Sequence, residues 1–105
     1  MQNILITGGS GFLGSNLIKK LLKRKNLKIF ILVRKETNFL RLNSINNKIT
    51  HINLNKNLES FFYKYKFHTI IHCATDYGRG AKKSKLDIVN ANLILPLKLI
   101  ELAIK

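Results

Sequence analysis

Three glycines near the start of the chain have a spacing that suits the binding of a phosphate group. Gly8, Gly11 and Gly14 lie in the run TGGSGFLG, directly after a short apolar stretch. Gly8 would let the chain turn sharply off a strand, Gly11 would leave room for a diphosphate, and Gly14 would let a following helix pack closely. The amides near Phe12 and Leu13 would then point at the phosphates, helped by the helix dipole. The run therefore predicts a diphosphate-binding turn formed by these five residues; a purely structural glycine turn is the alternative.

Such a turn needs a strand before it and a helix after it, and the apolar pattern predicts both. Continuous or alternating apolar runs indicate strands, and apolar residues at helical spacing indicate helices. In chain order we expect strands at residues 3–7, 28–33, 49–54 and 69–73, and helices at residues 11–25, 38–45, 58–65 and 86–105. This alternation is typical of a parallel α/β sheet. We expect the first and fourth strands to pair, which leaves the fourth strand at an edge of the sheet and the chain marginally stable.

Length, charge and cysteine content limit the class of protein. The chain has 105 residues, which we interpret as one domain, and 46% of them are apolar. No apolar run is long enough to span a membrane. The single cysteine, Cys73, fits a reducing, cytoplasmic compartment. The net charge of +14 comes mostly from scattered lysines. We interpret it as a compositional bias rather than a nucleic-acid-binding surface, and a small basic nucleic-acid-binding module remains the alternative function.

The last predicted helix is apolar on two faces and contains a proline. Pro96 removes one backbone hydrogen bond and should cost about 3 kcal/mol unless the helix is distorted there. Two sets of apolar residues lie on different faces: Ile88, Ala91, Leu95, Leu99 and Leu102 form one, and Leu93, Leu97, Ile100 and Ile104 the other. One face can cover the sheet, whereas the other needs a second partner. This second partner could be a further part of the protein, or a second copy of the chain in a homodimer, and both alternatives are open.

The spacing of the glycines, together with Thr7 and Phe12, resembles the extended short-chain dehydrogenase/reductase family of nucleotide-sugar epimerases and dehydratases. The resemblance covers the whole chain and implies the amino-terminal part of a Rossmann-like, doubly wound parallel sheet, with about four strands. It also implies a nicotinamide dinucleotide as cofactor. In the family the fourth strand and its loop line the nicotinamide side, which assigns Ala74 and Thr75 to the cofactor, and the following helix opens with an asparagine, which is Asn92 here.

Within this family, one segment carries a closer resemblance. Residues 71–78 (IHCATDYG), followed by residues 92–105, are most similar to reductases that make CDP-linked 3,6-dideoxysugars, the CDP-abequose synthase type. This resemblance implies a nucleotide-sugar substrate for a complete enzyme. The residues that would select the sugar are not in the sequence.

The end of the second predicted strand bears on the choice of nicotinamide cofactor. An acidic residue there normally binds the ribose 2′-hydroxyl, but this chain has Arg34. A guanidinium can make two parallel charged hydrogen bonds to a 2′-phosphate, which favours NADP. Glu36 is an acidic residue close by, so NAD remains the alternative cofactor. After the third strand the family usually has an aspartate that contacts adenine; Asn53 stands there, followed by Leu54, and an asparagine can still form such a hydrogen bond.

The catalytic pair of the family does not occur in this sequence. That pair is a tyrosine followed four residues later by a lysine, whereas Tyr63, Tyr65 and Tyr77 are followed at that distance by phenylalanine, threonine and alanine. The three histidines do not have the spacing of metal ligands. We therefore assign no catalytic and no metal-binding residue. We expect the NAD(P)-binding portion of a nucleotide-sugar epimerase, dehydratase or reductase, truncated and inactive alone, where complete members are roughly three times as long.

Overall fold

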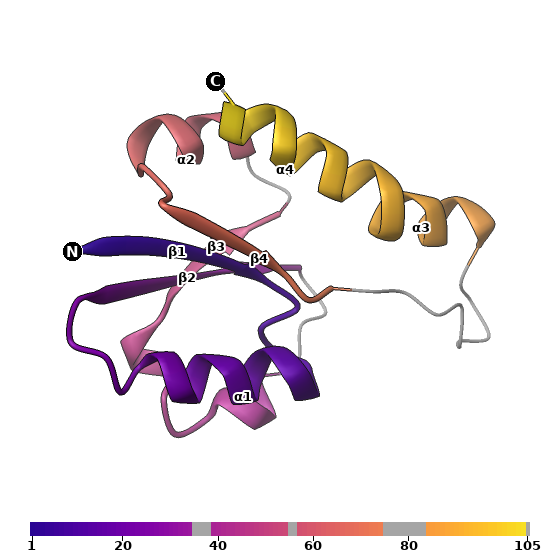
Figure 1. Ribbon diagram of the computed structural model, residues 1–105. Helices are drawn as coiled ribbons and strands as arrows, with labels where there is room; N and C mark the ends of the chain where they lie inside the picture. Colours follow the sequence, from indigo (N-terminus) through magenta and orange to yellow (C-terminus); the bar gives the residue numbers. More distant parts are fainter. Residues whose placement is uncertain (35–38, 55–56, 75–83, 105) are drawn as a thin grey trace. The chain divides into compact units, whose positions relative to one another are not determined.

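The computed structural model describes residues 1–34, 39–54, 57–74 and 84–104 (Figure 1). The chain divides after Cys73 into two compact units, which we describe separately. Among the described helices, none combines the length and apolar character that a membrane crossing needs.

The first unit contains a four-stranded parallel sheet in the order β3-β2-β1-β4. Its strands are β1 (Gln2–Thr7), β2 (Leu27–Val33), β3 (Thr50–Asn53) and β4 (Thr69–His72). Its helices are α1 (Phe12–Leu21) and α2 (Leu58–Lys64), with two short 3₁₀ turns, η1 (Leu40–Leu42) and η2 (Asn46–Lys48). All four expected strands are present, β1 pairs with β4, and β4 lies at an edge of the described sheet. The α/β fold class is confirmed.

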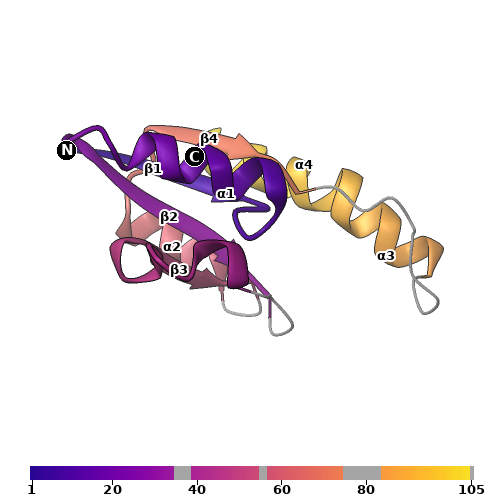
Figure 2. The same cartoon turned by 90° about the horizontal axis from the view of Figure 1, so that it is seen from below.

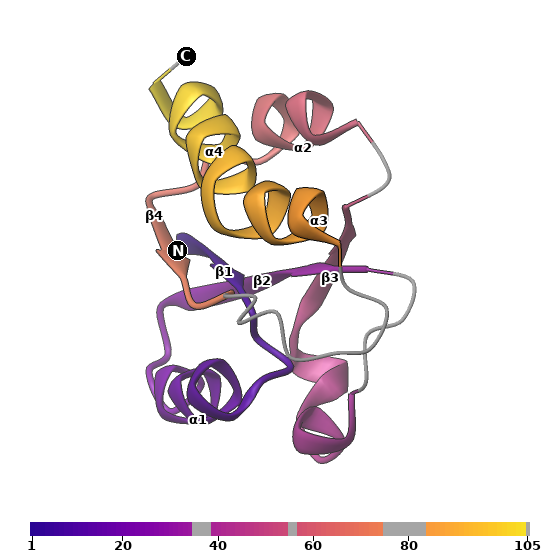
Figure 3. The same cartoon turned by 90° about the vertical axis from the view of Figure 1, so that its right-hand side faces the viewer.

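The two faces of the sheet are covered by different helices, and α1 and α2 lie on opposite sides (Figures 2 and 3). The α1 face holds the main apolar cluster, with the buried residues Ile4, Ile6, Ile18, Ile29, Ile31, Leu42 and Ile49. Because side chains alternate along a strand, Leu5, Phe30 and Ile52 lie on the other face, and all three are buried. There the ring of Phe30 lies 4.7 Å from that of Tyr65, which directly follows α2.

The segment after β2 differs from the expected helix at residues 38–45. It forms the 3₁₀ turns η1 and η2 instead, and Asn38 lies outside the described residues. Phe39, Leu42 and Ile45 all pack against the core, and backbone hydrogen bonds link each of them to the next. A spacing of three matches the 3.0 residues per turn of a 3₁₀ helix, so this geometry turns all three side chains toward the core, with Leu42 buried and Phe39 and Ile45 half-buried.

Helix α1 is also shorter than expected, because it ends at Leu21 and not near residue 25. The chain then tightens through hydrogen bonds from Lys23 to Lys20 and from Arg24 to Leu21. This turn brings the chain back to β2, where the amide of Gln2 donates to the carbonyl of Asn26. Of the basic residues in this part of the sequence, Lys19 and Lys20 lie in the last turn of α1, whereas Lys23, Arg24 and Lys25 follow the helix.

The second unit consists of three consecutive helical segments, α3 (Lys85–Val89), a π-helical segment η3 (Asn90–Ile94) and α4 (Leu95–Ile104). Ser84 and Asp87 form a capping box at the start of α3. The wide turn η3 directly precedes α4, whose second residue is Pro96, and the ring of Pro96 would clash with the carbonyl of Asn92 in a regular α-helix. The expected distortion at Pro96 is therefore present.

The two apolar faces of the last helix differ in exposure. The set that contains Leu99 is buried or half-buried, whereas Leu93, Leu97, Ile100 and Ile104 are exposed. The homodimer contact through the exposed set remains a prediction.

Helix α1 begins directly against the end of β1, and two glycines allow this approach. Gly8 has a φ of 70°, a conformation that favours glycine. A Cβ atom at Gly14 would lie 2.2 Å from the carbonyl oxygen of Gly8. At Gly11 a Cβ atom would meet only that same oxygen, at 3.3 Å, and otherwise open space. Gly14 is therefore required for packing, whereas a Cβ atom at residue 11 needs only a small shift of the Gly8 carbonyl.

This difference predicts opposite outcomes for two alanine substitutions. Gly14→Ala forces α1 away from the strand and should lower the free energy of unfolding by about 1–3 kcal/mol or more. Gly11→Ala, at the position that precedes the helix, should change it by no more than about 1 kcal/mol. Urea denaturation followed by circular dichroism measures both. Equal destabilisation by the two substitutions would contradict this account of the turn.

Candidate functional site

The carboxyl ends of β1 and β4 form a topological switch point. The chain leaves β1 for α1 on one face of the sheet, and it reaches β4 from α2 on the other face. Thr7 and His72 are register partners at these two ends, and the amide of Cys73 donates to the carbonyl of Thr7 over 3.0 Å. In open α/β sheets, ligands bind outside the strand ends at such a point.

The predicted phosphate-binding turn lies at this switch point. Gly8 follows β1, and its carbonyl oxygen accepts a hydrogen bond from the amide of Gly11 over 3.1 Å. Gly11 is extended and precedes α1, which begins at Phe12. Gly8, Gly11, Phe12, Leu13 and Gly14 are thus brought together where a strand runs into a helix, as the sequence predicts.

The amino end of α1 leaves its first amides available to an anion. No side chain caps this end of the helix, and its first turn holds no acidic residue. The side chains of Ser15 and Asn16 both donate to the carbonyl of Phe12. The first amides of a helix have no partner within it, and the helix dipole makes this end electropositive. Phe12 and Leu13 are exposed beside it.

A further glycine was missed by the sequence analysis. Gly9 is buried, and a Cβ atom there would lie 2.9 Å from side-chain atoms of both Ile18 and Ile31. Its lack of a side chain lets the turn pack over the junction of α1 and β2. The double glycine after a strand was the available signal.

The neighbouring strand ends carry the residues that were assigned to the adenosine half of the cofactor. Arg34 directly follows β2 and is exposed. Asn53 ends β3 as the register partner of Val33, and the amide of Leu54 donates to the carbonyl of Val33 over 2.8 Å. Arg34, Asn53 and Leu54 therefore lie at the same edge of the sheet as the glycine turn, with the end of β2 between β3 and β1.

The remaining predicted residues lie elsewhere in the chain. Ala74 begins the second unit, and Asn92 lies in its π-helical segment η3. Thr75 and Glu36 lie outside the described residues. The cofactor roles of Ala74, Thr75 and Asn92 remain predictions.

A hydrogen bond between two side chains joins the ends of β1 and β4, and the sequence analysis did not foresee it. Thr7 Oγ1 and His72 Nδ1 are 2.6 Å apart. Burial lowers the pKa of His72 from its usual 6.5, because it penalises the charged imidazolium. Among the described residues, no three side chains capable of metal binding lie together. The interaction that the structure shows for His72 at the switch point is its hydrogen bond with Thr7.

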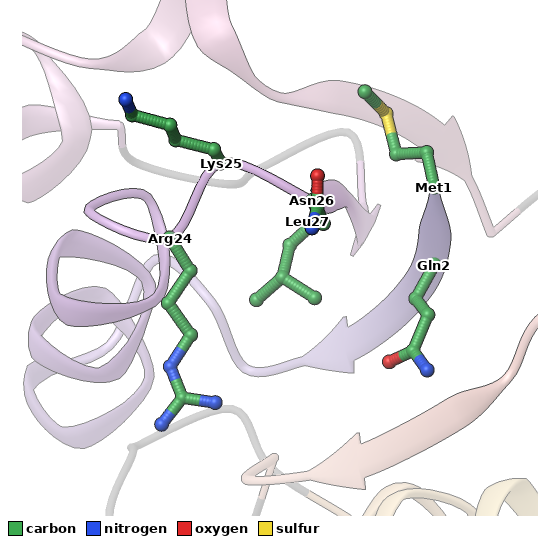
Figure 4. A pocket seen from close by; sticks show the side chains of 6 residues that line it. All are labelled: Met1, Gln2, Arg24, Lys25, Asn26 and Leu27. Atoms are coloured by element: carbon green, nitrogen blue, oxygen red, sulfur yellow. The ribbon is translucent and has the colours of Figure 1, made fainter.

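A wide hollow lies at the opposite edge of the sheet, at the amino ends of β1 and β2. It has a volume of about 630 Å³ (Figure 4). Its lining consists of Met1, Gln2, Arg24, Lys25, Asn26 and Leu27. Ligands of open α/β sheets bind at the carboxyl edge, so we place the functional site at the glycine turn and not at this hollow.

The lowered pKa of His72 predicts a pH-dependent stability. The imidazole of His72 takes up its proton at a higher pH in the unfolded chain than in the folded chain. The contribution of neutral His72 to the free energy of unfolding is therefore complete above the usual pKa. It is lost as the pH falls through the lower, folded-state pKa. Urea denaturation between about pH 7.5 and 5 should show a larger loss of stability for the natural sequence than for His72→Gln. Identical losses in the two proteins would contradict the prediction.

The sequence matches the family model described as the NAD dependent epimerase/dehydratase family over residues 4–105. A curated relative is CDP-abequose synthase from Salmonella typhimurium, which is 32% identical over 110 residues. That match covers 99% of this chain and 34% of the relative. The chain thus spans about a third of the length of the curated relatives that it matches.

Solved structures of similar proteins share the fold. The UDP-Glc/GlcNAc 4-epimerase from Campylobacter jejuni matches with a TM-score of 0.75 and 21% identity, over 99% of this chain and 34% of that one. The dTDP-glucose 4,6-dehydratase from Bacillus anthracis, in complex with NAD, matches with a TM-score of 0.73 and 23% identity, over 97% and 33%. Because the family model covers nearly the whole sequence, the chain belongs to the NAD dependent epimerase/dehydratase family.

Proposed function

We propose that the first unit binds the diphosphate of a nicotinamide dinucleotide over the turn formed by Gly8, Gly11 and Gly14. One observation carries the proposal: α1 starts against the end of β1, and among the described atoms a Cβ atom at Gly11 would meet only the carbonyl oxygen of Gly8, at 3.3 Å. The packing of the chain tolerates a small side chain at residue 11 far better than at residue 14, whereas a diphosphate close to the backbone needs a glycine there. The uncapped amides at the start of α1 supply hydrogen-bond donors of the right charge. The residues present therefore fit the group.

The neighbouring strand ends supply groups for the adenosine half. We assign Arg34 to a ribose 2′-phosphate, which makes NADP the favoured cofactor and NAD the alternative. We assign Asn53 and Leu54 to the adenine, and Ala74, Thr75 and Asn92 to the nicotinamide side. Support for the last three comes from their places in the family pattern.

For the protein as a whole, we propose an enzyme that acts on a nucleotide-linked sugar. The chain spans about a third of curated relatives named CDP-abequose synthase. The bound nicotinamide would exchange a hydride with a sugar carbon. The family's tyrosine–lysine pair is not in this sequence, so we expect these 105 residues to bind dinucleotide without turning over a sugar.

Titration with NADPH and NADH tests the proposal. The natural chain should bind at least one of them, and Gly11→Leu should weaken binding more than about tenfold, equivalent to about 1.4 kcal/mol. Ser44→Leu adds the same bulk at an exposed position outside the turn and serves as the matched control. Calorimetry gives the affinities, and circular dichroism confirms folding.

Two outcomes would count against a dinucleotide site. One is equal binding by the natural chain and Gly11→Leu. The other is no nucleotide binding together with strong, salt-dependent retention on heparin, which would favour the nucleic-acid-binding alternative.

Arg34→Ala should discriminate between the two cofactors. Loss of charged hydrogen bonds worth about 1.5–3 kcal/mol should weaken NADPH binding by roughly 10- to 100-fold. NADH lacks the 2′-phosphate, so its affinity should change less than about threefold. Arg41→Ala, which removes an exposed arginine from η1, is the control. Equal effects of Arg34→Ala on both nucleotides would refute the 2′-phosphate role.

A further inference from the structure

The contact between Thr7 and His72 joins a buried side chain to an exposed one. The Thr7 side chain is only 1% exposed, whereas His72 lies at the surface of the edge strand β4. Their atoms Oγ1 and Nδ1 are 2.6 Å apart, within the range of a strong hydrogen bond. A buried hydroxyl needs a partner, and here His72 provides one.

Thr7 is also the last residue before the phosphate-binding turn. Its carbonyl accepts the amide of Cys73, so β4 holds both its main chain and its side chain. The next residue, Gly8, has the positive φ and accepts the amide of Gly11. A rotation of the Thr7 backbone therefore changes the direction of the Gly8 carbonyl, which accepts the amide of Gly11.

We propose that His72 is a positioning residue for the phosphate-binding turn and acts through its hydrogen bond with Thr7. In the neutral imidazole with the proton on Nε2, Nδ1 accepts the threonine hydroxyl hydrogen. That arrangement fixes the rotamer of Thr7 and with it the start of the turn. With a proton on Nδ1 the direction would reverse: Nδ1–H would donate to Thr7 Oγ1, and the hydroxyl hydrogen would turn elsewhere. The consequence for dinucleotide affinity rests on the proposed function above.

Few other titratable groups in the described residues share this face of the sheet. β1 carries none, β4 carries only His72, and β2 contributes Lys28. On the same side, α2 carries Glu59, Tyr63 and Lys64, and Tyr65 follows it. The hydrogen bond from His72 therefore leads to Thr7 and not to a charged partner in the first unit.

Four substitutions separate the hydrogen bond from the bulk of the side chains. His72→Asn keeps an acceptor close to the place of Nδ1, whereas His72→Leu removes it. Thr7→Ser keeps the hydroxyl, whereas Thr7→Val removes it at nearly constant volume. His72 is exposed, so its two variants should fold even if a change at the buried Thr7 does not.

Nuclear magnetic resonance of the full chain gives the readout. In the natural chain, the imidazole nitrogen shifts should show the proton on Nε2. Hydrogen exchange of the Gly11 amide, which bonds to Gly8, should be about tenfold faster in His72→Leu and Thr7→Val, but near the natural rate in His72→Asn and Thr7→Ser. The Nε2 preference should weaken in Thr7→Val.

The same variants distinguish this inference from the proposed function. A tenfold loss of NADPH affinity in His72→Leu but not in His72→Asn is expected. If the natural chain binds no dinucleotide, the proposed function fails, while the exchange rates still decide whether His72 positions the turn. Unchanged exchange at Gly11 in a folded His72→Leu variant would overturn the inference.

Discussion

The functional edge of this protein depends on one close contact, the approach of α1 to the carbonyl of Gly8. A Cβ atom at Gly14 would lie 2.2 Å from that oxygen, so the helix can start there only if residue 14 has no side chain. The contact sets the direction of α1 and aims its free amides past the end of β1. It also leaves open space beside Gly11. This packing supports the proposed anion site, and the turn itself holds no charged side chain.

The order of the strands places that contact at the switch point of the sheet. Because β1 lies between β2 and β4, the turn after β1 stands at the point where the chain's connections pass to opposite faces of the sheet. The ends of β2 and β3 bring Arg34 and Asn53 to the same edge. The contact of Thr7 with His72 ties the turn to β4. A dinucleotide, which is long and carries charge at its centre, fits such a row of strand ends.

The sequence predicted those features that depend on short-range patterns. The four strands follow from apolar runs, and the place of Gly8, Gly11 and Gly14 between a strand and a helix follows from their spacing. The 3₁₀ turns were missed because Phe39, Leu42 and Ile45 fit a weak helical pattern nearly as well as a spacing of three. The contact of His72 with Thr7 could not be predicted, because it depends on the register between two strands that lie 65 residues apart. The π-helical segment was expected only as some distortion at Pro96.

The most direct test of the central claim is to map NADPH binding onto the backbone amides of the isotopically labelled chain. Our account predicts the largest chemical-shift changes at Gly8, Gly11 and Leu13, with smaller changes near Arg34. The hollow at the opposite edge, which Gln2 and Asn26 line, should show none. Changes confined to that hollow, or an unaffected glycine turn in the presence of saturating NADPH, would contradict the assignment of the turn as the diphosphate site.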